Sequence, residues 1–135
     1  MNIENKQIAR EELNKFILSL NNESNNGSIV IVEGKKDVEA LYFIGYEGNI
    51  ESYHHFRGTT NCVDFCSINY KKLILLLDFD IKGKTITKKI LSQINGKFID
   101  LKYKKKLLRI TGGRILKIEE IKSFYLYIQK NKHQD

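Results

Sequence analysis

Hydrophobic residues in the first part of the chain recur at roughly helical spacing. Within residues 3–20 these are Ile8, Leu13, Phe16, Ile17 and Leu20, a pattern that predicts an amphipathic helix. The next segment, residues 21–28, reads NNESNNGS and is polar and rich in turn-forming residues. We therefore expect an N-terminal helix followed by a connector.

After this connector, short apolar runs alternate with segments of helical periodicity. Strands are predicted at residues 29–33, 49–56, 72–78 and 97–101, and helices at residues 36–45, 61–69, 82–95 and 118–130. The five consecutive apolar residues 73–77 indicate a strand that is buried on both faces. Such alternation predicts an α/β fold whose mainly parallel, four-stranded sheet is flanked by helices. We expect residues 1–27 to form the N-terminal helix and connector, and residues 28–135 the α/β domain with a C-terminal helix.

Composition narrows the class of protein. The 135 residues suit one domain, and 41% are hydrophobic, without an apolar run long enough to span a bilayer. The polar N-terminus is not a secretory signal, so we expect a cytoplasmic protein without membrane contact. A net charge of +7 is compatible with a polyanionic partner. Cys62 and Cys66 are too few for a disulfide framework, and we interpret them as reduced, partly buried thiols.

Three carboxylates follow predicted strands. Glu33 ends the first strand, whereas Asp78 and Asp80 follow the apolar strand of residues 72–78. In a parallel sheet the carboxyl ends of the strands meet at one edge, so these side chains can converge. Residues i and i+2 of an extended chain point to the same side, which lets both aspartates reach one cation. Magnesium prefers such carboxylate oxygens, so the pattern predicts a Mg²⁺ site, with Mn²⁺ as a substitute.

Other interpretations of the same residues fit less well. Asp37 alone fits a helix N-terminus, where acidic residues are favoured. A strand that ends in Asp also occurs in nucleotide-hydrolysing P-loop proteins, but the G-x-x-x-x-G-K-S/T loop is absent from this sequence. Haloacid-dehalogenase-type phosphatases usually begin with an Asp-x-Asp motif that is followed two residues later by Thr or Val. In this chain the motif lies past the middle of the sequence and is followed by Lys82, so that family fits poorly.

The two motifs together resemble the Toprim family. Glu33-Gly34-x-x-Asp37 after one strand and Asp78-x-Asp80-x-x-Gly83 after another are the pattern of that family, and the resemblance covers about residues 28–101. Residues 35–41, 111–114 and 118–120 are also similar to small stand-alone archaeal and bacterial Toprim proteins. The resemblance implies a general acid or base role, or a metal-ligand role, for Glu33, Mg²⁺ coordination by the two aspartates, and supporting roles for Gly34, Asp37 and Gly83.

Basic residues near these motifs are candidates for contacts with a nucleic-acid backbone. The candidates are Lys35, Lys36, Arg57, Lys82, Lys84 and Arg109. The lysine-rich run of residues 102–106 has two interpretations, a phosphate-binding patch or a solvated face.

Three functions remain open at this stage. By analogy with the Toprim-family maturase of 5S ribosomal RNA, the leading hypothesis is a magnesium-dependent endonuclease that cuts structured RNA. The second is a non-catalytic nucleic-acid-binding module in repair, recombination or RNA processing. The third is a component of a primase-like nucleotidyl transferase. RNA is favoured over DNA as the partner, and both a homodimer and a larger protein complex stay open.

Overall fold

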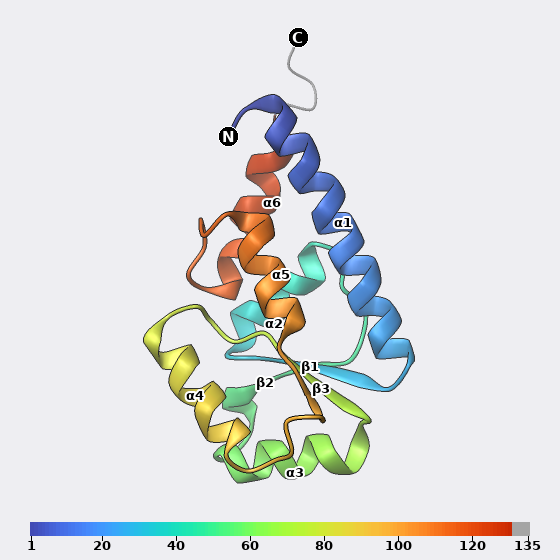
Figure 1. The fold of residues 1–135 in the computed structure, drawn as a ribbon, viewed down its shortest axis with the longest axis vertical. Coiled ribbons are helices and arrows are strands. Elements are labelled where there is room, and N and C mark those ends of the chain that lie inside the picture. Colours follow the sequence, from blue (N-terminus) through green and yellow to red (C-terminus); the bar gives the residue numbers. More distant parts are fainter. Residues whose placement is uncertain (131–135) are drawn as a thin grey trace.

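A parallel sheet forms the centre of the computed structural model, which describes residues 1–130 (Figure 1). Its strands are β1 (Ser28–Val32), β2 (Ile50–Ser52), β3 (Lys72–Leu75) and β4 (Ile99–Asp100), in the order β2-β1-β3-β4. All three neighbouring pairs are parallel. The predicted α/β fold with a mainly parallel, four-stranded sheet is confirmed.

Helices cover both faces of the sheet (Figure 1). They are α1 (Ile3–Asn25), α2 (Lys35–Phe43), α3 (Thr59–Asn69), α4 (Ile81–Leu91), α5 (Lys102–Thr111) and α6 (Ile121–Gln129), with short 3₁₀ turns η1 (Tyr53–His55) and η2 (Ile118–Glu120). Helices α1, α2, α5 and α6 pack on one face, whereas α3 and α4 pack on the other. Among the described residues, no helix has both the length and the apolar character needed to cross a membrane.

The apolar strands separate two hydrophobic cores. Val30 and Ile74 point toward the four-helix side, whereas Ile31 and Leu75 point toward α3 and α4. All four side chains are fully buried. Because successive residues of a strand alternate between faces, only a continuous apolar run can supply both cores. The consecutive apolar residues of β1 and β3 therefore form the two central strands.

Helix α1 is longer than its hydrophobic pattern predicts. The predicted connector of residues 21–28 is mostly helical, and only Asn26 and Gly27 form the turn, with φ +98° at Gly27. The polar side chains in this segment have tertiary partners. Asn21 accepts a hydrogen bond from the Glu47 amide at 2.8 Å, and Ser24 Oγ accepts one from the Asn49 amide at 2.8 Å. These bonds favour continuation of the helix where composition alone indicates a loop.

Helix α5 is absent from the sequence prediction. Its segment, KYKKKLLRIT, contains the lysine-rich run. Tyr103, Leu107 and Ile110 nevertheless lie on one buried face at helical spacing, and Gly112 ends the helix with φ +61°. The segment contains four lysines around one buried tyrosine, so its high charge makes the helical spacing of the apolar residues difficult to recognise from the sequence. The run of residues 102–106 is therefore the exposed side of an amphipathic helix together with one inward lysine, Lys104.

Several element boundaries also differ from the predictions. β2 is only three residues long, because the chain turns into η1 where the prediction continued the strand to residue 56. Helix α4 ends at Leu91, before the predicted end at residue 95. The predicted C-terminal helix is divided into η2 and α6. Cys62 and Cys66 are free thiols, fully buried on α3.

Candidate metal centre and its basic surroundings

Three carboxylates converge where the two central strands end. Glu33 follows β1 and Asp78 lies three residues beyond β3, and these strands are neighbours whose paired residues include Ile31 and Leu75. Together with Asp80 they form what we call the acidic cluster, in which one ligand atom from each residue lies within 4.8 Å of the others. The sheet therefore brings together the three residues that the sequence predicts as metal ligands.

Glu33 contributes a buried oxygen without a partner. The residue is 6% exposed, and its Oε1 atom makes no hydrogen bond in the described structure. Its Oε2 atom lies 3.8 Å from Lys82 Nζ, whose side chain is 64% exposed. A buried carboxylate oxygen without a partner is costly, and a bound cation would satisfy it.

The side chain of Asp78 is positioned by a residue that is distant in the sequence. Its Oδ1 atom accepts a hydrogen bond of 2.8 Å from the backbone amide of Ile118, 40 residues later. Burial raises the pKa of Asp78 to about 6, and the negative charges of Asp37, Glu33 and Asp80 act in the same direction, whereas the Ile118 bond lowers it. The site therefore holds negative charge that the surrounding protein does not fully neutralise.

Asp80 has a second role as the N-cap of α4. One of its carboxylate oxygens, Oδ1, accepts a 2.9 Å bond from the Gly83 amide. This bond fixes the direction of the side chain and satisfies an amide of the first helical turn. The residue is only partly buried, unlike Glu33 and Asp78. Asp80 is thus the most accessible carboxylate of the acidic cluster.

The predicted supporting residues differ in what they contribute. A methyl group on Gly83 would overlap the Asp78 carbonyl oxygen, so the close approach of α4 to this strand end requires glycine. Gly34 adopts an extended φ of −139°, which other residues tolerate, and a Cβ there would meet His54 only at 3.7 Å. Asp37 is 5% exposed and accepts a 2.9 Å bond from the Gly34 amide, so it stabilises the start of α2.

The predicted basic residues do not form one group. Lys82 lies beside Glu33, and Lys84 lines a cavity next to the cluster. Lys35 and Lys36 are exposed in the first turn of α2, and Arg57 is exposed in the loop after η1. Arg109 instead borders α1, where it lines cavities with residues such as Glu12.

Lys104 is a site residue that the sequence analysis considered only as part of the lysine-rich run of residues 102–106, without placing it beside the acidic cluster. Its Nζ atom donates a 3.2 Å hydrogen bond to the Asp78 carbonyl oxygen and lies 5.5 Å from the centre of the Phe79 ring. Burial lowers the pKa of Lys104, while the nearby charge of Asp78 raises it and that of Lys84 lowers it. The signal that could have found it is the helical period of Tyr103, Leu107 and Ile110, which separates Lys104 from the outward lysines.

The donor set fits a hard divalent cation. All three ligands are carboxylates, and no histidine or thiol belongs to this group. Mg²⁺ and Mn²⁺ favour oxygen ligands, whereas Zn²⁺ sites usually contain nitrogen or sulfur. The unpartnered Glu33 oxygen and the raised pKa of Asp78 agree with a site that gains stability from a cation.

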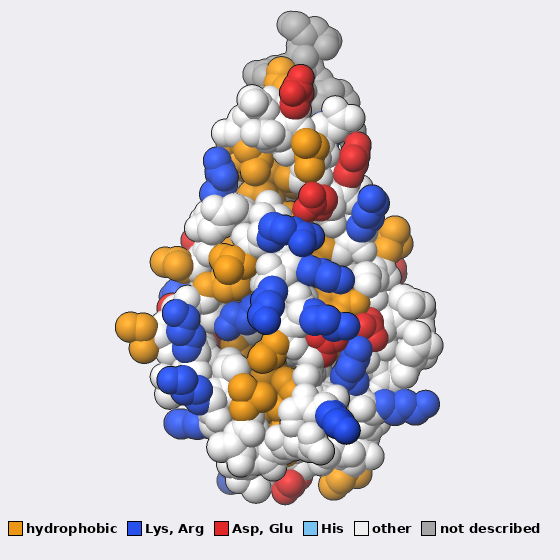
Figure 2. Space-filling model, in the orientation of Figure 1, with side chains coloured by type: hydrophobic (Ala, Val, Ile, Leu, Met, Phe, Trp, Pro, Cys, Tyr) orange, Lys and Arg blue, Asp and Glu red, His pale blue; other side chains and the backbone are white. Residues whose placement is uncertain are grey.

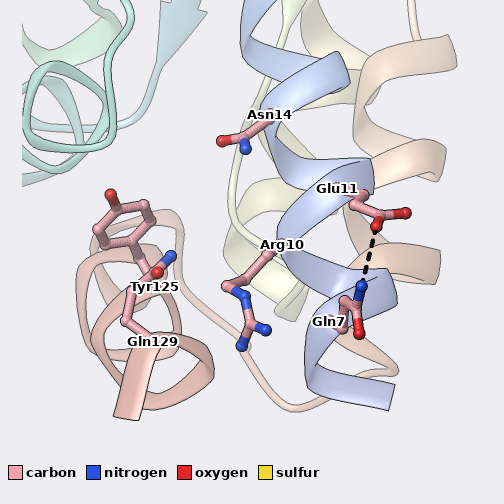
Figure 3. Close-up of a pocket in the computed structure, with 6 residues that line it drawn as sticks. All are labelled: Gln7, Arg10, Glu11, Asn14, Tyr125 and Gln129. Atoms are coloured by element: carbon pink, nitrogen blue, oxygen red, sulfur yellow. Dashed lines mark hydrogen bonds between the residues drawn. The ribbon is translucent and has the colours of Figure 1, made fainter. Parts of the chain in front are cut away.

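A different cavity, of about 310 Å³, lies between α1 and α6 (Figure 3). Its lining consists of Gln7, Arg10, Glu11, Asn14, Tyr125 and Gln129. Arg10 donates a 2.5 Å hydrogen bond to the Ile128 carbonyl, and Gln7 contacts Glu11 at 3.5 Å. Three of the lining residues, Gln7, Arg10 and Glu11, therefore have partners within the protein, and Arg10 joins α1 to α6.

Comparisons with known proteins identify relatives of this chain. The chain is 36% identical over 108 residues to a UPF0292 protein of Archaeoglobus fulgidus, covering 78% of this chain and 83% of the relative. It is 30% identical over 122 residues to a UPF0292 protein of Methanosarcina barkeri, covering 89% and 82%. A solved structure of an Aquifex aeolicus protein is similar with a TM-score of 0.64 and 27% identity, covering 79% of this chain and 95% of that chain.

The family match includes every residue of the acidic cluster. Residues 27–111 match the Toprim domain family, and this range spans both carboxylate motifs and the whole parallel sheet. Sequence motif, strand order and the convergence of Glu33, Asp78 and Asp80 therefore lead to one assignment. The chain belongs to the Toprim domain family.

Proposed function

We propose that this protein is a magnesium-dependent endonuclease that acts on structured RNA. The observation that carries the proposal is the acidic cluster, whose three carboxylates converge with one buried oxygen lacking a partner. Lysines next to this cluster provide positive charge where a phosphodiester would approach. The choice of RNA rests on analogy with the 5S ribosomal RNA maturase of the Toprim family.

Each residue of the cluster has a defined part in this proposal. Asp78 and Asp80 would hold the cation, and Glu33 would add a ligand or exchange a proton with the attacking or leaving oxygen. Bound there, Mg²⁺ would neutralise charge on the scissile phosphate and help to position the nucleophile. The amide of Ile118 and the amide of Gly83 orient the two aspartates without help from a ligand.

Lysine side chains would bind the backbone on either side of the scissile phosphate. Lys82 and Lys84 extend from the first turns of α4, and both are exposed. Lys104 approaches the same strand end from α5. Such contacts make nucleic-acid affinity fall steeply with salt.

A non-catalytic nucleic-acid-binding module is the second candidate. The observation that favours it is the burial of two of the three carboxylates, because Glu33 and Asp78 are only 6% and 5% exposed. In that case the cluster would hold a structural cation, and the lysines alone would bind the nucleic acid. Metal-dependent cleavage separates the two candidates.

The test is cleavage of end-labelled structured RNA, single-stranded DNA and duplex DNA with Mg²⁺ or Mn²⁺. We expect the wild type to cut RNA and chelation to stop it. Glu33→Gln should lower the rate by about 10²–10⁴-fold, the usual range for a group that transfers a proton. Asp78→Asn and Asp80→Asn should reduce cutting to background.

The matched control is Asp64→Asn, which removes an exposed carboxylate on α3 and should leave the rate unchanged. Circular dichroism of each variant verifies folding. Cutting that persists in Asp78→Asn would contradict the proposal. Salt-sensitive binding without cutting by any variant would favour the binding module, and incorporation of nucleotides would favour a primase-like role.

A further inference from the structure

A cavity of about 340 Å³ opens beside the acidic cluster, between α4, α5 and the segment that links α5 to η2. Its lining consists of Phe79, Lys84, Lys104, Lys105, Leu108, Gly113, Ile115 and Leu116. Phe79 is the residue between the two aspartates, and its amide donates a 2.7 Å bond to the Leu116 carbonyl. One wall of the cavity is therefore attached directly to the metal-binding strand end.

The cavity combines an apolar interior with cationic borders. Leu108 and Leu116 remain 45% and 61% exposed, although large apolar side chains are usually covered. Lys84 and Lys105 are exposed at its border, and Lys104 lies between Phe79 and the Asp78 carbonyl. Figure 2 shows this face, where hydrophobic side chains lie among Lys and Arg side chains over α4 and α5.

This combination matches the two parts of a nucleotide. A base has an apolar, stackable face, which suits Phe79 and the leucines, whereas its phosphate carries the negative charge that lysines bind. The volume lies near the lower end of ligand pockets, roughly 300–1,000 Å³, so it suits one nucleotide rather than a folded segment. An acidic peptide would satisfy the lysines but would leave the aromatic face without a planar partner.

We propose that this cavity binds the base of an unpaired nucleotide that adjoins the phosphate at the acidic cluster. The inference rests on the proposed function and adds its substrate class: a strand whose base at this position is free to leave the stack. Bases inside a duplex are stacked and paired, so they reach such a cavity only after being turned out. RNA and single-stranded DNA share this chemistry.

Tryptophan fluorescence tests occupancy without any cleavage. The chain contains no tryptophan, so Leu116→Trp introduces a single indole at the cavity wall. Ile68→Trp is the matched control, because Ile68 is 81% exposed near the end of α3, just before the start of β3. It therefore lies toward the amino-terminal ends of the parallel strands, whereas the acidic cluster lies at their carboxyl ends. Titrations with short RNA and DNA oligonucleotides, duplex DNA and an oligonucleotide with one abasic site are done in EDTA.

We expect single-stranded oligonucleotides to quench Leu116→Trp at least several-fold more than Ile68→Trp. Duplex DNA should quench the fluorescence little. The abasic oligonucleotide should still bind, but it should not quench when the abasic position lies at the cavity. The RNA and DNA arms report which sugar the site prefers. Equal quenching of the two variants, or equal quenching by duplex and single strand, would overturn the proposal.

A charge placed in the cavity gives a second measurement. Leu108→Glu and Ile68→Glu change the net charge equally, and both positions are exposed. Because stacking of one base on an aromatic side chain contributes strongly, we expect Leu108→Glu to weaken single-strand binding by about tenfold beyond Ile68→Glu. Equal affinities of the two variants would overturn the proposal.

The two proposals can fail separately. Cleavage that depends on Asp78, with no selective quenching of Leu116→Trp, would sink the cavity and leave the nuclease. Selective quenching in EDTA without cleavage in Mg²⁺ would keep the cavity and remove the nuclease, which leaves a protein that binds unpaired nucleotides.

Discussion

Two groups of buried and partly buried carboxylates lie in this fold, and their negative charges are neutralised differently. In the first, which we call the Lys72 cluster, the Lys72 ammonium lies 3.0 Å from Glu23 and 3.2 Å from Asp100. Tyr103 donates a further 3.1 Å bond to Glu23. The acidic cluster, in contrast, has three carboxylates and one exposed lysine at 3.8 Å from Glu33.

The difference separates a structural polar group from a candidate binding site. Asp100 Oδ2 is buried and makes an ion pair with Lys72, although their geometry is not that of a hydrogen bond. Burial lowers the pKa of Lys72, but its interactions with the carboxylates of Glu23 and Asp100 outweigh this effect and raise the pKa. A raised pKa means that the charged form of Lys72 is favoured. In the acidic cluster the pKa of Asp78 is also raised, but for a carboxylate this means that the charged form is disfavoured. Charge balance inside the fold therefore distinguishes an ion-pair network that is completed by the protein from a candidate cation site.

Removal of the Lys72 ammonium should disrupt the Lys72 cluster. Lys72→Met keeps much of the side-chain volume but removes the nearer cation from buried Asp100, which keeps only the exposed Lys102 ammonium at 4.0 Å. We expect a loss of about 2–4 kcal/mol in the free energy of unfolding, measured by urea denaturation. Lys89→Met, at an exposed position on α4, is the control and should cost less than about 0.5 kcal/mol.

A double variant sharpens this test. Adding Asp100→Asn to Lys72→Met removes the uncompensated charge, so part of the lost stability should return. If Lys72→Met were as mild as Lys89→Met, the contrast between the two groups of carboxylates would disappear.

The acidic cluster should respond to loss of charge in the opposite direction. Asp78 has a raised folded-state pKa of about 6, so the native state holds its proton more tightly than the unfolded chain does. In metal-free buffer, its contribution to stability is therefore present below about pH 4 and is lost as the pH rises through about 6. Asp78→Asn keeps an acceptor for the Ile118 amide and does not titrate.

We expect Asp78→Asn to match the wild type near pH 4 and to be about 1–3 kcal/mol more stable by pH 7.5. Urea denaturation across this range, with Asp64→Asn as control, measures the difference. A difference that does not change with pH would show that Asp78 does not titrate as its surroundings indicate.

Magnesium should stabilise the wild type and leave the neutralised variant unchanged. A ligand that binds only the folded state stabilises it by about 1.4 kcal/mol for each tenfold excess over its dissociation constant. With about 10 mM Mg²⁺ we expect the Tm of the wild type to rise by about 3–8 °C, and that of Asp78→Asn to stay constant.

Calorimetry at constant ionic strength measures the shift, and Na⁺ replaces Mg²⁺ in the reference sample. The Lys72→Met variant should keep the full Tm increase with Mg²⁺, because the ammonium group that it removes belongs to the Lys72 cluster and not to the acidic cluster. An equal rise in wild type and Asp78→Asn would attribute the effect to nonspecific ion binding.

Sequence patterns predicted the features that depend on neighbouring residues. The apolar runs of β1 and β3 predicted buried parallel strands, and the position of Glu33 and Asp78 after those runs predicted their convergence. The strand period and the rule that parallel strands end at one edge were sufficient for this.

Features that depend on distant partners were not predictable in the same way. The extension of α1 to Asn25 is favoured by hydrogen bonds that Asn21 and Ser24 accept from backbone amides more than twenty positions later. Lys104 faces the acidic cluster only because α5 packs against the sheet, and its charge run conceals that helix. The cavity wall formed by Leu116 likewise depends on a backbone bond from Phe79, for which the sequence carries no local signal.

The hydrogen bond between Ile118 and Asp78 limits where the protein chain can be truncated. The family match stops at Thr111, so a fragment trimmed to that match would hold all three carboxylates and the whole sheet. It would lack the amide that orients Asp78 and the carbonyl that receives the Phe79 amide. A boundary drawn from the family match would thus separate a candidate metal ligand from the amide that orients it, and the shortest fragment that keeps both extends at least through η2.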